Sequence, residues 1–260
     1  MSTPPPSIAE LRAATQPATL FERHSGEHWA GRLYMRRFSP YVTRLALAAG
    51  MSADGVTALM IPCGLLAAFL VSIPGIVPAV GAVALIQLQL LLDCSDGEVA
   101  RWRRRSSPAG IYLDRIGHHV TEAALPCGLG VRADGGWDSL GGWTTLGLLV
   151  AVLVLLIKSE TSLVYVARAA AGRAPAEDRA AVAAPRGGAL RSIRQALGYL
   201  PFFRAFVAME ATLLALAAAI ADSVAGDHRG SRVLLVALVA IAALTAVGHL
   251  VATLASRRLD

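Results

Sequence analysis

The sequence predicts an all-α, polytopic membrane protein with six transmembrane helices and an N-terminal amphipathic helix at the membrane interface. The 260 residues are 55% hydrophobic and only 16% charged, with a mean hydropathy of +0.55. A soluble domain is usually less apolar and more highly charged. Long apolar segments alternate with connections rich in proline, glycine or arginine, and the arginines are unevenly divided among these connections. Such a pattern is typical of a chain that crosses a membrane several times.

Residues 1–50 differ in composition from residues 51–260, where we expect the membrane domain. A solvated polar arm is expected for residues 1–28. In residues 29–49, aromatic and leucine side chains alternate with arginines, which predicts an amphipathic or broken helix lying in the membrane interface. The region has no signal-peptide pattern, so we expect its N-terminus to stay uncleaved.

Local start and stop signals bound the six expected spans. Ser52 or Asp54 is a suitable N-cap for the first span, and Pro74, Gly75 and Pro78 interrupt the chain before the second. Ser107 precedes the start of the third. The expected spans are residues 56–73, 79–100, 109–131, 144–167, 199–220 and 233–255.

The arginine distribution predicts the orientation of these spans. The expected outer connections contain only Arg132, Arg229 and Arg232, whereas every inner segment contains more arginines. Because positively charged connections stay in the cytoplasm, both termini and the polar ends of the second and third spans should face the cytoplasm from the cell membrane. The formal charge of +6 suits anionic lipid and phosphate partners. Nothing resembles a nucleic-acid-binding module, so we expect no nucleic-acid partner.

Two pairs of polar residues occupy the second and third spans. Asp93 and Asp96 are three residues apart, and Asp114 and His118 are four apart, so each pair lies on one helix face. Facing helices that each contribute two ligands can hold divalent metal. Mg²⁺ prefers a few carboxylates together with substrate phosphate oxygens, and therefore the pattern indicates phosphoryl chemistry.

Small residues and one arginine accompany these acids. Gly97, Ala100 and Gly110 lack bulk and would let a nucleotide approach the helix backbone closely. Arg101 is always charged and is suited to grip phosphate. These four residues and Asp96 form the expected nucleotide-binding surface.

The residues from Asp93 to His118 resemble the signature of the CDP-alcohol phosphotransferase family. Seven of its eight positions match at the right spacing, and His118 stands where the family normally has aspartate. The resemblance implies a six-helix bundle, usually a homodimer, whose site opens to the cytosol. It also implies that an acceptor hydroxyl attacks a CDP-linked donor and releases CMP, with Asp93, Asp96 and Asp114 as metal ligands.

His118 is where the chain departs from the family pattern. The resemblance implies a catalytic pair of Asp114 and His118, in which His118 is the base for the acceptor hydroxyl, and a neutral imidazole can serve as base or as metal ligand. We expect a two-metal site for Mg²⁺ or Mn²⁺, with Mn²⁺ better tolerated because imidazole is the softer ligand. Glu122, one turn further on, is expected to orient the imidazole by accepting its other ring N–H, or to replace the missing ligand. Loss of activity is the alternative meaning of His118.

An acceptor-binding role is the weaker expectation for Lys158, Arg191 and Arg194. Lys158 lies within an apolar span, where an ionisable group either binds a ligand or pairs with a neighbouring acid. Arg191 and Arg194 either form a basic pocket for a phosphorylated acceptor or are ordinary positive-inside residues. For each of these three residues, the two interpretations given for it stay open.

The favoured function is phospholipid biosynthesis, by transfer of a phosphatidyl group from CDP-diacylglycerol to a polar alcohol. A site near the membrane interface suits that lipid donor. One alternative is the same chemistry from a soluble CDP-alcohol. A non-enzymatic membrane transporter is another, although no inverted repeat of broken segments is visible.

Overall fold

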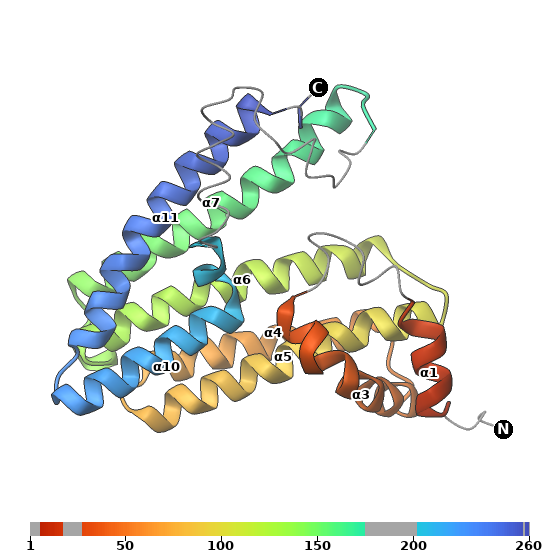
Figure 1. The fold of residues 1–260 in the computed structure, drawn as a ribbon, viewed down its shortest axis with the longest axis horizontal. Coiled ribbons are helices and arrows are strands. Elements are labelled where there is room, and N and C mark those ends of the chain that lie inside the picture. Colours follow the sequence, from red (N-terminus) through yellow and green to blue (C-terminus); the bar gives the residue numbers. More distant parts are fainter. Residues whose placement is uncertain (1–5, 18–27, 175–201, 257, 260) are drawn as a thin grey trace. The chain divides into compact units, whose positions relative to one another are not determined.

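The computed structural model describes residues 6–17, 28–174, 202–256 and 258–259. Its described residues are helical and contain no β-strand (Figure 1), which confirms the all-α prediction. The elements are α1 (Ile8–Thr15), η1 (Gly31–Met35), α3 (Arg36–Ala48), α4 (Ala53–Ser72), α5 (Ile76–Trp102), α6 (Pro108–Asp134), η2 (Trp137–Ser139), α7 (Gly142–Ala170), η3 (Phe202–Phe206), α10 (Ala208–Ala225) and α11 (Arg229–Ala255).

The chain divides into two compact units. The first consists of Met1–Ala67 and Val83–Thr121, and the second of Ala68–Ala82 and Glu122–Asp260. Helices α4, α5 and α6 each contribute residues to both units.

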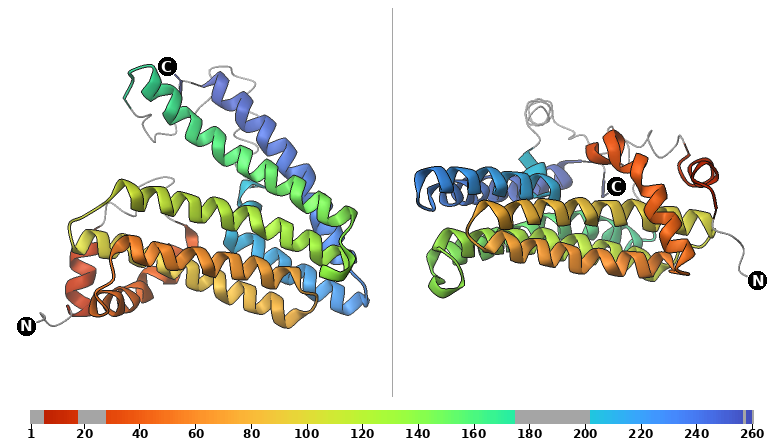
Figure 2. Two further views of the ribbon diagram at one scale, coloured as in Figure 1. Left: turned by 180° about the vertical axis from the view of Figure 1, so that it is seen from behind. Right: turned by 90° about the horizontal axis from the view of Figure 1, so that it is seen from below.

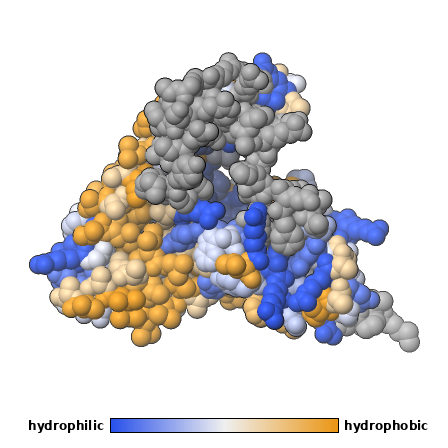
Figure 3. All heavy atoms as spheres, viewed as in Figure 1, coloured by the Kyte–Doolittle hydropathy of each residue, from blue (hydrophilic) through white to orange (hydrophobic). Residues whose placement is uncertain are grey.

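Five described helices are long and apolar enough to cross a membrane, namely α4, α5, α7, α10 and α11. Many of their large apolar side chains are exposed, and Figure 3 shows such side chains gathered over α10 and along α11. Exposed apolar surface on this scale is suited to lipid rather than water, so the chain is an integral membrane protein. Helix α6 has 27 residues but carries several ionisable groups, and a sixth span stays a prediction.

The first unit packs α3, α4 and α5 around a small apolar core. Its buried members are Ala46, Val56, Met60, Leu92 and Val99. Within this unit α4 and α5 run side by side in every view (Figure 2). Ser52 accepts a hydrogen bond from the Gly55 N–H at 3.0 Å, as expected for the N-cap of α4.

The prediction of a solvated arm is wrong for the helix α1. Ser7 and Glu10 form a capping box at its start, and Leu11 is completely buried. The capping hydrogen bonds from Ser7 lower the pKa of the exposed Glu10 carboxyl. Capping and the burial of one leucine stabilise a helix that would be too short to persist alone. Residues 18–27 of the expected arm lie outside the described residues.

The amphipathic helix expected at residues 29–49 is present as η1 and α3. Helix α3 buries Ser39 and Thr43 on one face and exposes Phe38, Tyr41 and Leu45 on another. Spacings of three and four residues place these exposed side chains on one stripe. Its location at a membrane interface stays a prediction.

Several helices start a few residues away from the predicted spans, and two of these differences have a clear physical reason. Helix α5 begins at Ile76, before Pro78, because a proline in the first turn removes an N–H that has no helical acceptor. Residues 199–201 of the span expected from residue 199 lie outside the described residues, and its described part becomes α-helix only at Ala208. Residues Phe202–Phe206 form a 3₁₀ turn, and the extended backbone of Val207 separates it from α10.

The second unit contains a buried arginine at the end of α6. Arg132, at the end of α6, is 1% exposed. Its guanidinium donates to the carbonyl oxygens of Ile73 and Gly75 and to Ser231 Oγ, at 3.0, 3.1 and 3.1 Å. Asp222 Oδ2 lies 3.5 Å from Arg132 Nε. The arginine therefore ties the end of α6 to the α4–α5 connection, the last turn of α10 and the first turn of α11.

Candidate active site

All the signature residues lie on two helices of the first unit. Helix α5 carries the segment from Asp93 to Arg101, and α6 carries Gly110, Asp114 and His118. Each pair of polar residues is roughly one helical turn apart, as the sequence predicts.

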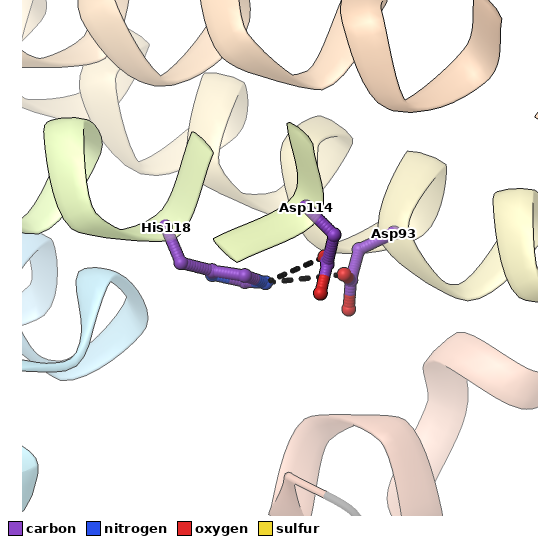
Figure 4. A group of neighbouring side chains, drawn as sticks. All are labelled: Asp93, Asp114 and His118. Atoms are coloured by element: carbon purple, nitrogen blue, oxygen red, sulfur yellow. Dashed lines mark hydrogen bonds and ion pairs between the residues drawn. The ribbon is translucent and has the colours of Figure 1, made fainter. Parts of the chain in front are cut away.

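Asp93, Asp114 and His118 converge from the two helices (Figure 4). His118 Nε2 lies 3.1 Å from Asp93 Oδ1 and 3.5 Å from Asp114 Oδ1. One ligand atom from each residue lies within 4.8 Å of the others. The side chains of His118, Asp93 and Asp114 are 29%, 31% and 40% exposed, so small ligands have access. Two carboxylates and an imidazole are a suitable ligand set for a divalent transition metal or, with substrate oxygens, for Mg²⁺.

Asp96 is held separately by α4. The hydroxyl of Thr57 donates to Asp96 Oδ2 at 2.6 Å, and Thr57 itself is 3% exposed. Asp96 is not part of the three-residue cluster. Because Thr57 occupies one carboxylate oxygen, the orientation of the Asp96 carboxylate is fixed by a third helix.

Gly110 lies against the carboxylate of Asp54 at the start of α4. A Cβ atom at Gly110 would come 2.5 Å from Asp54 Oδ1. Ser107 joins the two, because its hydroxyl donates to Asp54 Oδ2 at 2.8 Å and accepts from the Gly110 N–H at 2.8 Å. The missing side chain therefore makes room for Asp54, whether or not it also makes room for a nucleotide.

Arg101 extends back over Gly97, one turn earlier on α5. Its two terminal nitrogens lie 3.0 and 3.4 Å from the place of a Cβ atom at Gly97. Its Nε donates to the backbone carbonyl of Thr15 at 2.6 Å. Ala100, between them in sequence, is half-buried.

The other expected site residues are Glu122, Lys158, Arg191 and Arg194. Glu122 and Lys158 belong to the second unit, where Lys158 Nζ lies 2.7 Å from Glu122 Oε2. Lys158 therefore pairs with a neighbouring acid, which is one of the two interpretations that the sequence left open. The same contact gives Glu122 a partner other than the His118 imidazole. Arg191 and Arg194 lie outside the described residues.

Sequence reasoning missed Thr57, Ser107 and the Thr15 carbonyl as parts of this site, and it considered Asp54 only as a helix cap. A signal for α4 was present, because Asp54 and Thr57 are polar residues three apart at the start of an apolar helix. No comparable signal marks Thr15, whose contribution is a backbone atom.

The fold and the site define an all-α integral membrane protein with a partly exposed carboxylate–imidazole cluster on two adjacent helices. The sequence model of the CDP-alcohol phosphatidyltransferase family matches residues 51–255, well over half of the 260 residues. The chain belongs to this family, whose members are transferases that generally use divalent metals. Comparison with curated proteins found no match.

Proposed function

We propose that the protein transfers a phosphatidyl group from CDP-diacylglycerol to the hydroxyl of a polar alcohol and releases CMP. Family membership supports transfer from a CDP-alcohol. The observation that carries the proposal is the convergence of Asp93, Asp114 and His118. A lipid donor is supported by the exposed apolar side chains of α4 and α5, since α5 also carries the site.

In the proposed reaction, the acceptor oxygen bonds to the phosphorus distal to cytidine as the bond from that phosphorus to the CMP oxygen breaks. Divalent cations, held by Asp93, Asp96 and Asp114, would neutralise charge on the diphosphate. The neutral His118 imidazole takes the proton from the attacking hydroxyl. Asp93 Oδ1 lies 3.1 Å from His118 Nε2, and this contact would help to set the orientation of the ring. Arg101 holds the donor diphosphate against Gly97.

The proposal also includes the topology, with the site and both termini on the cytoplasmic side, as a homodimer in the cell membrane. The arginine-rich inner segments of the sequence support that orientation. We further propose that residues 1–50 form a region of their own and residues 51–260 the membrane domain. Cysteine labelling from each side of sealed vesicles tests the orientation.

The decisive experiment is an assay of the purified protein with CDP-diacylglycerol and a panel of polar alcohols, including glycerol phosphate and inositol phosphate. We expect CMP release that depends on Mg²⁺ or Mn²⁺, with the labelled diacylglycerol moiety recovered in a new phospholipid. Asp93→Asn should abolish CMP release. CMP release from soluble CDP-alcohols alone would disprove the lipid donor, and its absence with every donor would disprove transferase activity.

A further inference from the structure

Glu98 is a buried carboxylate in the middle of the signature segment. Its side chain is completely inaccessible. Ser39 and Thr43 of α3 donate hydroxyl hydrogen bonds to it at 2.5 and 2.7 Å, and Gln16 donates an amide hydrogen bond at 2.8 Å. Arg36 Nη1 lies 3.5 Å from Glu98 Oε1. A buried charge is costly unless it is hydrogen-bonded and paired, so Glu98 requires these N-terminal residues around it.

Gln16, which directly follows α1, joins three helices through one amide group. Its Nε2 donates to Glu98 Oε1 of α5 and to the Arg36 carbonyl of α3, both at 2.8 Å. That carbonyl needs another donor because Pro40, four residues later within α3, has no N–H. Gln16 therefore supplies the hydrogen bond that Pro40 cannot donate. Its two hydrogen bonds fix the end of α1 against α3 and α5.

The fixed end of α1 holds Arg101. The carbonyl of Thr15, the last residue of α1, accepts the Arg101 Nε hydrogen bond at 2.6 Å. Carbonyl groups at a helix C-terminus carry partial negative charge and favour a cation. The contact directs the terminal nitrogens of Arg101 over Gly97.

We propose that the C-terminal end of α1 is a positioning element for the nucleotide diphosphate. Gln16 and Glu98 are positioning residues: they fix the Thr15 carbonyl, which in turn holds Arg101 ready to contact the diphosphate. The inference rests on the proposed function, because it takes Arg101 as the group that contacts the donor diphosphate. An arginine held in place before binding loses less side-chain entropy when it binds phosphate. Without the contact to the Thr15 carbonyl, Arg101 would become ordered only when the diphosphate binds, and the lost side-chain entropy would lower the affinity for the diphosphate.

The test is a double-mutant cycle measured by binding of CDP to the purified full-length protein in detergent with Mg²⁺. We expect Arg101→Ala to weaken CDP binding by roughly tenfold or more, as for loss of a charged hydrogen bond. Gln16→Ala should weaken it by about fivefold, a smaller effect because the guanidinium is still present. The combined variant should bind no more weakly than Arg101→Ala alone, because Gln16 acts through Arg101.

Gln87→Ala is the matched control. It removes another hydrogen bond between the N-terminal region and α5, the one that the Tyr34 hydroxyl donates to Gln87 at 2.6 Å, and it leaves Glu98 and Arg101 untouched. We expect CDP binding to change less than twofold in this variant. In turnover assays Gln16→Ala should raise KM for the donor with little change in kcat, since Arg101 would hold the diphosphate in the ground and transition states alike. Glu98→Gln should bind CDP more tightly than Glu98→Ala, since the amide still accepts from Gln16.

Two results would overturn the inference. One is additive losses in the combined variant, and the other is equal weakening by Gln87→Ala, which would indicate general loosening of the N-terminal region. A wild-type protein that binds CDP without releasing CMP would contradict the proposed function alone, and the binding cycle would still decide the role of α1. A wild-type protein that does not bind CDP would overturn both.

Discussion

His118 and Asp93 meet across two helices, with Nε2 of the imidazole 3.1 Å from Oδ1 of the carboxylate. The family normally has aspartate at position 118, and two carboxylates at this separation would repel one another without a cation. The imidazole can approach Asp93 without that repulsion. The substitution thus changes the charge of the cluster, and in the proposed reaction it also changes the base.

The first prediction concerns this histidine. His118→Ala should lower kcat by roughly 10²–10⁴-fold, the usual contribution of a general base. His119→Ala, the adjacent residue on the same helix, is the matched control and should keep near-normal turnover. Steady-state CMP release with donor and metal saturating is the measurement. Unchanged turnover in His118→Ala would remove this residue from the mechanism.

Restoring aspartate at the same position tests its effect on the metal. His118→Asp adds a hard carboxylate oxygen, so we expect activity at lower Mg²⁺ concentrations and a smaller advantage for Mn²⁺. The measurement is the activation curve for each metal in the two proteins. Identical curves would show that position 118 does not influence metal choice.

The hydrogen bond from Thr57 of α4 to Asp96 of α5 leads to a prediction about metal affinity. Thr57→Val keeps the shape but removes the donor, and we expect metal affinity to fall about 10–100-fold, as when the partner of a ligating carboxylate is lost. Thr57→Ser keeps the hydroxyl and should stay close to wild type. Mn²⁺ binding followed by electron paramagnetic resonance measures this directly. Equal affinities for the valine and serine variants would contradict the prediction.

Variants at Gly110 distinguish a steric effect on stability from an effect on CMP release. Gly110→Ala should lower the thermal unfolding midpoint, because its Cβ would come 2.5 Å from Asp54 Oδ1. Adding Asp54→Ala should restore the midpoint without restoring CMP release if Gly110 also adjoins the nucleotide. Gly248→Ala is the control, since nothing lies within 4 Å of a Cβ there, and it should not lower the midpoint. Full recovery of CMP release in the double variant would show that only Asp54 needs the glycine.

The Lys158–Glu122 pair yields a stability prediction. Lys158→Met leaves the Glu122 carboxylate, 7% exposed, without its ion-pair partner, and should destabilise the fold by about 3–5 kcal/mol. Adding Glu122→Gln should recover much of this loss. The acceptor KM of the double variant should match wild type. A raised acceptor KM in a double variant of normal stability would indicate that Lys158 binds the acceptor.

The sequence predicted the helical membrane fold because apolar content and segment length are local properties of the chain. Helix α1 was missed because its stability comes from tertiary burial of Leu11 and from capping, neither of which is visible as a long periodic pattern. The start of α10 was placed too early because hydropathy alone does not separate the 3₁₀ turn at Phe202–Phe206 from the helix that follows.

At the site, the spacings within α5 and α6 predicted which side chains share a face. They did not predict the contacts that fix those side chains, because these come from distant segments. Thr57 and Asp96 are 39 residues apart and Thr15 and Arg101 are 86 apart. Such contacts depend on how helices are placed beside one another, and one sequence carries no direct record of that placement.

The buried Arg132 also has a consequence for the order of assembly. It is synthesised 99 residues before Ser231, to which it donates a hydrogen bond, and before Asp222, its ion-pair partner. A ribosome therefore delivers the guanidinium long before Asp222, the carboxylate that neutralises its charge. We expect the end of α6 to remain hydrated during insertion and to become fixed only when α10 and α11 pack against it.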